Sequence, residues 1–362
     1  MKRVALIGTG LIGGSIGLAL RRDGVEVIGF DADPSRAARA ATLGALSEVA
    51  RGVGEAVAGA DAVFVAVPVS RVADVVVAAL DGGAPVVSDV GSVKASVVAR
   101  VEQERPERAS AFVGGHPMAG SEQDGLDGAD ADLFLGATWV LTPTERTAPE
   151  AFTTVRSLVA GLGAEIVQVA PEHHDALVAV VSHVPQLAAT TLMDVAATSG
   201  EQPATLLRLA AGGFRDMTRI AAGHPGIWPD ICVANRDAIV RALDDYVAAL
   251  AEVRGLVLTG DARGLLELLE RARAARRNLP VGAETGEPLV ELRVPVPDRP
   301  GVLAEVTTLP ARLGVNIFDF EIVHSSEGGA GVLVLVVPES GAAAVEQGLA
   351  ELGYHPARSV LE

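Results

Sequence analysis

Short apolar runs recur along the first half of the chain, and segments with helical spacing separate them. After runs at residues 4–7 and 25–30, the further runs occupy residues 62–67, 85–89, 111–115, 138–142 and 165–169. Apolar runs of this length that alternate with helices are typical of buried parallel strands. We therefore predict that residues 1–170 form an α/β domain with a parallel sheet.

Amphipathic helical spacing replaces the strand pattern after Pro171. The expected helices span residues 174–197, 203–211, 213–222, 227–254 and 261–276. An apolar helical region without a sheet of its own usually buries its surface against a partner copy. Residues 171–280 are therefore predicted to mediate a homodimer, and the Pro, Gly and acidic content of residues 281–288 marks a linker.

Strand and helix patterns return in residues 289–362. The expected strands are residues 289–296, 315–323, 331–337 and 358–361, and the expected helices are residues 301–313 and 342–352. This β-α-β-β-α-β order is the ferredoxin-like plan. The segment shows no combination of acid, base and nucleophile, so we expect it to regulate rather than to catalyse.

Composition narrows the classes of partner. Of the 362 residues 49% are hydrophobic and 3% aromatic, and the formal net charge is −17. Without basic patches, so acidic a chain is not expected to bind nucleic acid or an anionic membrane surface. The uninterrupted apolar runs are too short to cross a bilayer, and the single cysteine, Cys232, offers neither a disulfide nor a zinc-ligand spacing. A soluble, cytoplasmic protein is expected.

The first apolar run leads into Gly8-x-Gly10-x-x-Gly13 and then a helical segment. Gly8 allows a tight turn, Gly10 lets the backbone approach a pyrophosphate, and Gly13 lets helix and strand pack closely. Asp31 ends the next strand, where it would accept hydrogen bonds from a ribose and repel a 2′-phosphate. This Rossmann-type fingerprint predicts NAD rather than NADP. The expected cofactor contacts are Gly8, Gly10, Leu11, Ile12, Gly13, Asp31, Pro68 and Asp89.

A secretory signal peptide is the alternative interpretation of the N-terminus, because Lys2 and Arg3 precede an apolar stretch. Five glycines interrupt that stretch, and no small-residue cleavage site precedes Arg21 and Arg22. The ordered strand, glycine turn, helix, strand and terminal acid favour the dinucleotide site.

Oxidation of an alcohol by NAD requires a base for the hydroxyl proton. His116 is the leading candidate because it follows a predicted strand, at the edge where ligands bind, and because imidazole titrates near neutral pH. The alternative is a histidine that only caps a loop. Ser92 could hydrogen-bond this histidine or the substrate hydroxyl, or cap a helix that begins near Val93, and both can hold.

The helical region supplies candidates for substrate contacts. Arg215 and Arg219 lie one helical turn apart, so they could clamp a carboxylate together or form ion pairs with acids such as Asp216. His183, in an otherwise apolar helix, is either a buried histidine with a backbone partner or a substrate contact.

Other acidic and imidazole side chains near these motifs can also be explained without a role in the site. Glu122 could balance charge in the pocket or be an exposed loop acid. His173 and His174 are expected on the solvent face of the first long helix.

Together these motifs resemble the prephenate dehydrogenase family, which includes arogenate dehydrogenases. The matching segments are residues 8–17, 89–94, 115–122, 181–185 and 212–220. The first motif alone is generic, but the ordered set is specific. Residues 298–303 and 313–317 resemble the characteristic turn and strand of an ACT domain.

The family resemblance implies NAD-dependent oxidative decarboxylation of prephenate to 4-hydroxyphenylpyruvate in tyrosine biosynthesis, without a metal. His116 would take the ring-hydroxyl proton, and Ser92 would hold that hydroxyl and the imidazole. Arg219 would bind a substrate carboxylate. The implied substrate contacts are Arg219, His183, Gln186, Glu122 and Arg215.

Three questions stay open at this point. Gln186 stands where several family members have a second histidine, so the substrate is prephenate or, alternatively, arogenate. The ACT resemblance implies feedback control by tyrosine, with Asp298, Gly301 and Asn316 as expected regulatory contacts. Another fused NAD-dependent hydroxyacid dehydrogenase and a non-catalytic sensor of NAD and amino acids are the remaining alternatives.

Overall fold

The computed structural model describes residues 2–121, 123, 125–198, 212–277, 288–297, 299–324 and 330–360. The chain divides into two compact units, Met1–Gly200 with Thr218–Ala248, and Glu201–Met217 with Ala249–Glu362. Several sequence predictions lie outside the described residues: the helix at 203–211, the contacts Glu122 and Asp298, and all but the last residue of the 281–288 linker.

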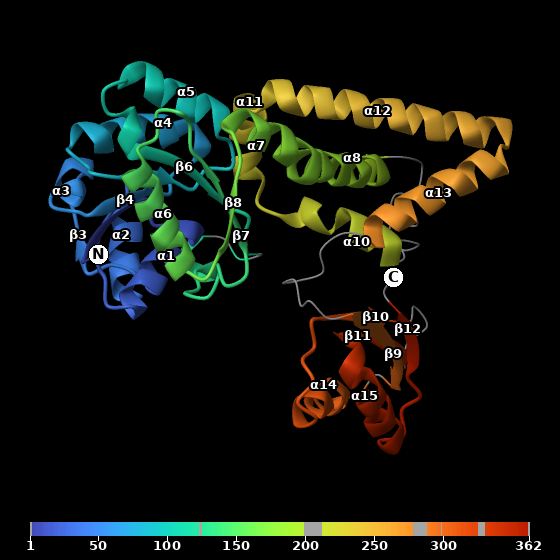
Figure 1. The fold of residues 1–362 in the computed structure, drawn as a ribbon. Helices are drawn as coiled ribbons and strands as arrows, with labels where there is room; N and C mark the ends of the chain where they lie inside the picture. The colour runs from blue at the N-terminus through green and yellow to red at the C-terminus, as the bar shows by residue number, and fades with distance from the viewer. Residues whose placement is uncertain are drawn as a thin grey trace. The chain divides into compact units, whose positions relative to one another are not determined.

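Within the described residues, the first unit holds an eight-stranded sheet with the order β3-β2-β1-β4-β5-β6-β7-β8 (Figure 1). Its strands are β1 (Arg3–Ile7), β2 (Glu26–Phe30), β3 (Glu48–Val49), β4 (Ala62–Val65), β5 (Val87–Asp89), β6 (Phe112–Pro117), β7 (Thr138–Thr142) and β8 (Glu165–Gln168). This order confirms the predicted Rossmann-type fold. The short β3 and the antiparallel pairing of β6 with β7 were not predicted from the sequence.

Helices cover both faces of this sheet (Figure 1). One face carries α1 (Leu11–Arg22), α2 (Pro34–Thr42) and α6 (Pro149–Gly161), and the other carries α3 (Val53–Val57), α4 (Val69–Asp81) and α5 (Ala95–Glu104). Val4 and Leu6 belong to one core and Ala5 and Ile7 to the other, because successive side chains of a strand point to opposite faces. Burial of both faces explains why the strands read as continuous apolar runs.

The helical region is less regular than predicted. Its elements are α7 (Pro171–Val178), the π-helical turn η3 (Ala179–His183), α8 (Val184–Thr198), α10 (Gly212–Thr218), the 3-10 turns η4 (Arg219–Ala222) and η5 (Pro225–Ile227), α11 (Trp228–Ala234), α12 (Arg236–Thr259) and α13 (Ala262–Arg277). The helix expected at 174–197 contains the π turn. The helix expected at 213–222 changes to 3-10 geometry after Thr218, and the one at 227–254 is interrupted at Asn235.

The helical run Pro171–Thr198 is long and apolar enough to span a membrane by length and composition. The sequence expectation concerned uninterrupted apolar runs, and it is not contradicted here because polar residues such as Ser182, His183 and Gln186 interrupt this helix. Its early turns, however, bury the polar side chains of His174 and Asp175 among other elements of the first unit. Such buried, hydrogen-bonded polar groups fit packing inside a protein rather than exposure to hydrocarbon.

The described part of the second unit contains a four-stranded antiparallel sheet with the order β10-β11-β9-β12. Its elements are β9 (Leu289–Pro297), α14 (Val302–Arg312), β10 (Asp319–His324), β11 (Ala330–Pro338), α15 (Glu339–Glu351) and β12 (Ala357–Val360). Both helices pack on one face of the sheet (Figure 1). The predicted ferredoxin-like domain is confirmed, with β10 beginning later than expected.

Candidate active site

The glycine turn lies between β1 and α1, at the carboxyl edge of the sheet. Gly8 has a φ of 95°, and a Cβ atom there would lie 2.2 Å from the carbonyl oxygen of Ala66. A Cβ on Gly13 would lie 2.1 Å from the carbonyl oxygen of Gly8, whereas a Cβ on Gly10 meets no described atom within 4 Å. Packing therefore requires glycine at positions 8 and 13, whereas Gly10 faces open space. This arrangement fits a pyrophosphate at the start of α1, where Leu11 and Ile12 are half-buried.

Asp31 follows β2 and faces this turn. Its Oδ2 accepts hydrogen bonds from the backbone N–H of Thr9 at 2.8 Å and from the Thr9 hydroxyl at 3.0 Å. Its Oδ1 accepts one from the backbone N–H of Asp33 at 2.9 Å. These bonds hold an oriented carboxylate beside the glycine turn, which suits the hydroxyl donors of a ribose. Pro68 follows β4 at the start of α4 and is exposed.

Asp89, an expected cofactor contact, instead has a fully buried carboxylate that the protein itself engages. The Lys94 ammonium, also fully buried, pairs with it, and the backbone N–H groups of Gly91 and Gly115 donate to it at 2.9 and 3.1 Å. Lys94 Nζ further donates to the Gly115 carbonyl at 2.8 Å. Burial lowers the pKa of Lys94, and the Asp89 carboxylate opposes that shift. The Asp89–Lys94 pair thus hydrogen-bonds both backbone groups of Gly115, which positions the backbone of the next residue, His116.

Close packing explains why two glycines precede His116. A Cβ on Gly114 would lie 2.4 Å from the Thr142 hydroxyl oxygen, and a Cβ on Gly115 would lie 2.6 Å from the Asp89 carbonyl oxygen. Larger residues would force β6 away from its neighbours. His116 is thus held near the end of β6 and is half-buried.

His174 is buried, at 1% exposure, which corrects the expectation of a solvent-facing residue; His173 is exposed as expected. His174 Nε2 lies 2.8 Å from His116 Nδ1, and His174 Nδ1 lies 2.8 Å from Asp175 Oδ1. The two imidazole rings meet edge to face with centroids 5.1 Å apart. The structure therefore joins His116 to a buried carboxylate through a second histidine.

The sequence analysis does not single out Asp175. A signal was available, because the buried positions of α7 are Pro171, His174, Asp175 and Val178. This spacing is that of one helical face, so two polar residues fall within an apolar stripe. Polar side chains at buried positions of a helix require partners, and that requirement marks them as structural or functional.

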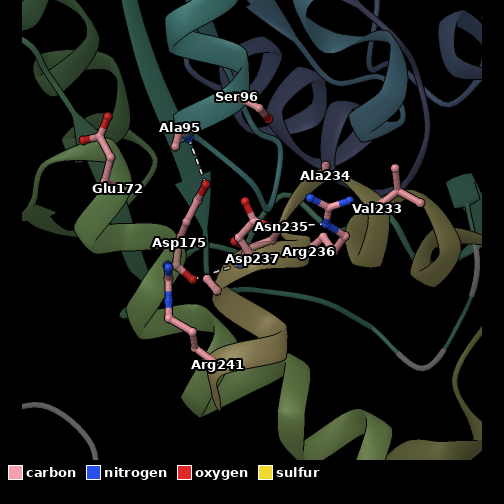
Figure 2. A pocket seen from close by; sticks show the side chains of 11 residues that line it. Ala95, Ser96, Glu172, Asp175, Val233, Ala234, Asn235, Arg236, Asp237 and Arg241 are labelled. Atoms are coloured by element: carbon pink, nitrogen blue, oxygen red, sulfur yellow. Dashed lines mark hydrogen bonds and ion pairs between the residues drawn. The ribbon is translucent and has the colours of Figure 1, made fainter. Parts of the chain in front are cut away.

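Asp175 also holds the start of α5. Its two carboxylate oxygens accept the backbone N–H group of Lys94 at 2.8 Å and that of Ala95 at 2.9 Å, the second of which is drawn in Figure 2. Because α5 begins at Ala95, the prediction that Ser92 caps a helix from Val93 is wrong. Ser92 is half-buried in the loop between β5 and α5, and across the described ranges no hydrogen bond joins it to His116.

His183 ends the π-helical turn and is buried, at 1% exposure. The Asn235 amide nitrogen lies 3.2 Å from His183 Nδ1 and 2.9 Å from the Asp175 carbonyl oxygen, so one side chain bridges both. Trp228 meets the ring edge to face. His183 therefore has a protein partner, but a side chain rather than the expected backbone group. Gln186 is also nearly buried and donates weakly to Thr190 at 3.4 Å.

Arg215 and Arg219 are both exposed and do not share a regular helix. Because α10 ends at Thr218 and Arg219 starts a 3-10 turn, the expected pairing on one helical face is wrong. Arg219 belongs to the first unit, where η4 packs against α8, and Arg215 belongs to the second unit.

Two imidazoles of the site, those of His116 and His183, have lowered pKa values. Burial lowers the pKa of His116 well below 6.5, and His174, Lys94 and His183 act in the same direction. Burial also lowers the pKa of His183 to about 4, against an opposing effect of Asp175. A neutral His116 can accept a proton at physiological pH.

Acid should destabilise the folded state through these two groups. The unfolded chain takes up their protons near pH 6.5, whereas the folded protein resists protonation of His183 until about pH 4. The free energy of unfolding should therefore decrease as pH falls from 6.5 to about 4. Urea denaturation at several pH values measures it. His183→Gln should flatten part of the slope, and an unchanged slope would contradict a buried neutral imidazole at this position.

A Rossmann-type sheet, a dinucleotide turn packed against it and a hydrogen-bonded histidine pair at its carboxyl edge define an NAD-dependent dehydrogenase. The family models agree. Residues 16–168 match the prephenate dehydrogenase nucleotide-binding domain, residues 170–271 the prephenate dehydrogenase dimerization domain, and residues 292–354 an AHAS small subunit-like ACT domain.

Individual relatives extend over most of the chain. It is 35% identical to the prephenate dehydrogenase of Bacillus subtilis (strain 168), over 91% of this chain and 90% of that one. It is 33% identical to the cyclohexadienyl dehydrogenase of Zymomonas mobilis, over 76% and 95%. The structure of Aquifex aeolicus prephenate dehydrogenase with hydroxyphenyl propionate and NAD+ superposes with a TM-score of 0.72 at 29% identity, over 77% and 99%. The chain belongs to the prephenate dehydrogenase family.

Proposed function

We propose that this protein oxidises and decarboxylates prephenate to 4-hydroxyphenylpyruvate with NAD, a step of tyrosine biosynthesis. The observation that carries the proposal is the hydrogen-bonded chain from half-buried His116 through buried His174 to Asp175, at the same sheet edge as the dinucleotide turn. Its relatives include prephenate and cyclohexadienyl dehydrogenases. Arogenate is the second candidate substrate, because Gln186 is uncharged where a further histidine could bind the pyruvyl group.

Residues of this chain accept and return the hydroxyl proton and bind the charged groups of the substrate. NAD, when bound, accepts the hydride. His116 Nε2 accepts the ring-hydroxyl proton, since Nδ1 already faces His174. Ser92 contacts the same hydroxyl. The new carbonyl is conjugated to the ring carbon that carries a carboxylate, so the electrons of that carbon–carbon bond move into the ring as carbon dioxide leaves. His116 returns the proton to the oxygen, which gives the phenol.

Parallel assays of NADH absorbance with prephenate and arogenate, each with NAD and with NADP, test this function. Rapid reduction with prephenate and NAD supports the proposal. A strong preference for arogenate would select the second substrate and make Gln186→His the first variant to examine. Failure of both substrates to reduce either cofactor would contradict the proposal and favour a non-catalytic sensor.

Arg219 is proposed to bind a substrate carboxylate, with His183, Gln186 and Glu122 as further contacts. Arg219→Ala should weaken substrate binding by about 2–4 kcal/mol, because a charged hydrogen bond is lost. The effect should appear in KM, with kcat largely retained. Arg100→Ala is the control, since Arg100 is an exposed arginine of α5 paired with Asp74 and Glu104. An unchanged KM in Arg219→Ala would place the carboxylate elsewhere.

Tyrosine is proposed to regulate the enzyme through its ACT-like domain. Gly301 adopts a φ of 89° at the start of α14, and Asn316 is exposed in the loop before β10. Because loops of this kind are accessible to small ligands, both remain candidate contacts, together with Asp298. A chain that ends at Pro288 should keep its dehydrogenase activity and lose inhibition by tyrosine. Rates with and without tyrosine measure this, and loss of all activity would make the domain structural.

A homodimer formed through the helical region is also proposed. The family model that matches residues 170–271 is a dimerization domain. The long helices α12 and α13 carry exposed apolar side chains, such as Val247, Val257, Leu258, Leu266 and Leu269. A partner copy would remove this apolar surface from water. Light scattering measures the molar mass in solution and so tests whether the protein is a dimer. The protein is also proposed to act in the cytoplasm.

A further inference from the structure

We propose that His174 and Asp175 are positioning residues that fix the tautomer of His116, so that its Nε2 is the unprotonated nitrogen offered to substrate. The inference rests on the proposed function, in which His116 is the base. It extends that function by two residues that touch neither substrate nor cofactor. The evidence is a directed set of hydrogen bonds that begins at a buried carboxylate.

The direction of this set follows from Asp175. Its Oδ1 accepts the Lys94 backbone N–H and its Oδ2 accepts the Ala95 backbone N–H. Because both oxygens already accept backbone N–H groups, the carboxylate is an acceptor toward His174 as well. Asp175 also lines a cavity of about 290 Å³ together with Arg241 (Figure 2).

An accepting Asp175 determines the protonation of both imidazoles. His174 Nδ1 must carry a proton, because it donates to Asp175 Oδ1 at 2.8 Å. In the neutral ring, His174 Nε2 then has the lone pair and accepts from His116 Nδ1 at 2.8 Å. His116 therefore keeps its own proton on Nδ1, and its Nε2 is free to accept the substrate proton.

The same arrangement stabilises the charge that catalysis creates. When His116 takes up the hydroxyl proton it becomes cationic in a buried site, beside the cationic Lys94. The Asp175 carboxylate, acting through His174, offsets this charge for as long as the dienone exists. A serine protease triad uses a carboxylate in this manner with one histidine. In this protein a second histidine lies between them.

His174→Phe tests the role because it keeps a ring and removes both nitrogens. We expect kcat to fall about 10²-fold, the lower end of the range that a general base contributes, with KM and NAD affinity nearly unchanged. His174→Gln should recover most of this activity, because its amide oxygen can accept from His116 Nδ1–H. His173→Gln, at the exposed neighbouring position, is the matched control and should behave as wild type. Asp175 is a poorer target, since it also holds α5.

A second measurement identifies the tautomer of His116 and does not depend on enzymatic activity. NMR of the isotope-labelled histidine nitrogens in the free, full-length protein should show His116 protonated on Nδ1 and unprotonated on Nε2. His116→Asn assigns the signal by its loss. In His174→Phe the Nε2–H tautomer should become populated.

Two results would overturn the proposal. One is a wild-type His116 that carries its proton on Nε2, which would mean that His174 donates to it. The other is a folded His174→Gln variant as inactive as His174→Phe. If His174→Phe does not fold, the proposal is tested by the His116 tautomer of the wild-type protein and by the activity of His174→Gln. Absence of turnover in wild type would instead refute the proposed function, and the NMR result would still stand.

Discussion

Replacing His116 with asparagine should reduce kcat by about 10²–10⁴-fold, the usual range for loss of a general base, while NAD binding stays nearly intact. Asparagine is the informative choice because its amide nitrogen can take the place of Nδ1 and donate to His174. The variant therefore keeps the contact at 2.8 Å in the wild type and loses only the nitrogen that accepts the proton. Steady-state kinetics with prephenate and calorimetric titration with NAD measure the two effects.

Equal losses of turnover and NAD affinity in this variant would refute the assignment of His116 as the base. The pH profile of wild-type kcat/KM provides a check. Because burial lowers the pKa of His116 well below 6.5, the neutral, active imidazole should persist through pH 6.5. The rate should decline only at more acidic pH, and a decline centred above pH 6.5 would point to another group.

Lys94→Met should destabilise the folded protein by about 3–5 kcal/mol, because it leaves the buried Asp89 carboxylate without its cation. Methionine has a similar length, so the change removes charge and hydrogen bonds without opening a large cavity. The Gly115 carbonyl also loses its donor at 2.8 Å. Activity should fall as well, since this carbonyl belongs to the backbone that leads into His116. Urea unfolding measures the stability of the variant.

Two further variants show whether the stability lost in Lys94→Met comes from the unpaired buried charge. Arg100→Met removes an exposed, solvent-screened cation from pairs with Asp74 and Glu104, and should cost far less stability than Lys94→Met. The double variant Asp89→Asn/Lys94→Met should recover part of the lost stability, because no buried charge is left unpaired. If Lys94→Met costs no more than Arg100→Met, the buried pair does not stabilise this fold.

Much of the fold could be predicted because its signals are local. Strand runs, helical spacing and the glycine turn each depend on residues within a few positions of one another. The candidate base was accessible for the same reason, since His116 directly follows a predicted strand. The ferredoxin-like domain followed from the order of its elements alone.

Less local features could not be predicted. His116 and His174 are 58 positions apart, and Lys94 and Asp175 are 81 apart, so no pattern along the chain joins them. The π turn before His183 and the helix end at Thr218 changed which side chains share a face. Asp89 was placed at the cofactor by its position after a strand, yet Lys94 lies against it inside the protein.

The sequence by itself determined the Rossmann-type domain, the helical region, the ferredoxin-like domain and the position of His116 at the ligand edge, because short-range periodicity and glycine geometry specify them. Only the tertiary structure decided the partners of His116. The Asp175 carboxylate is a directing acceptor because backbone N–H groups at the start of a helix distant in sequence already donate to both of its oxygens. Packing among distant segments thus set the chemistry of the candidate site.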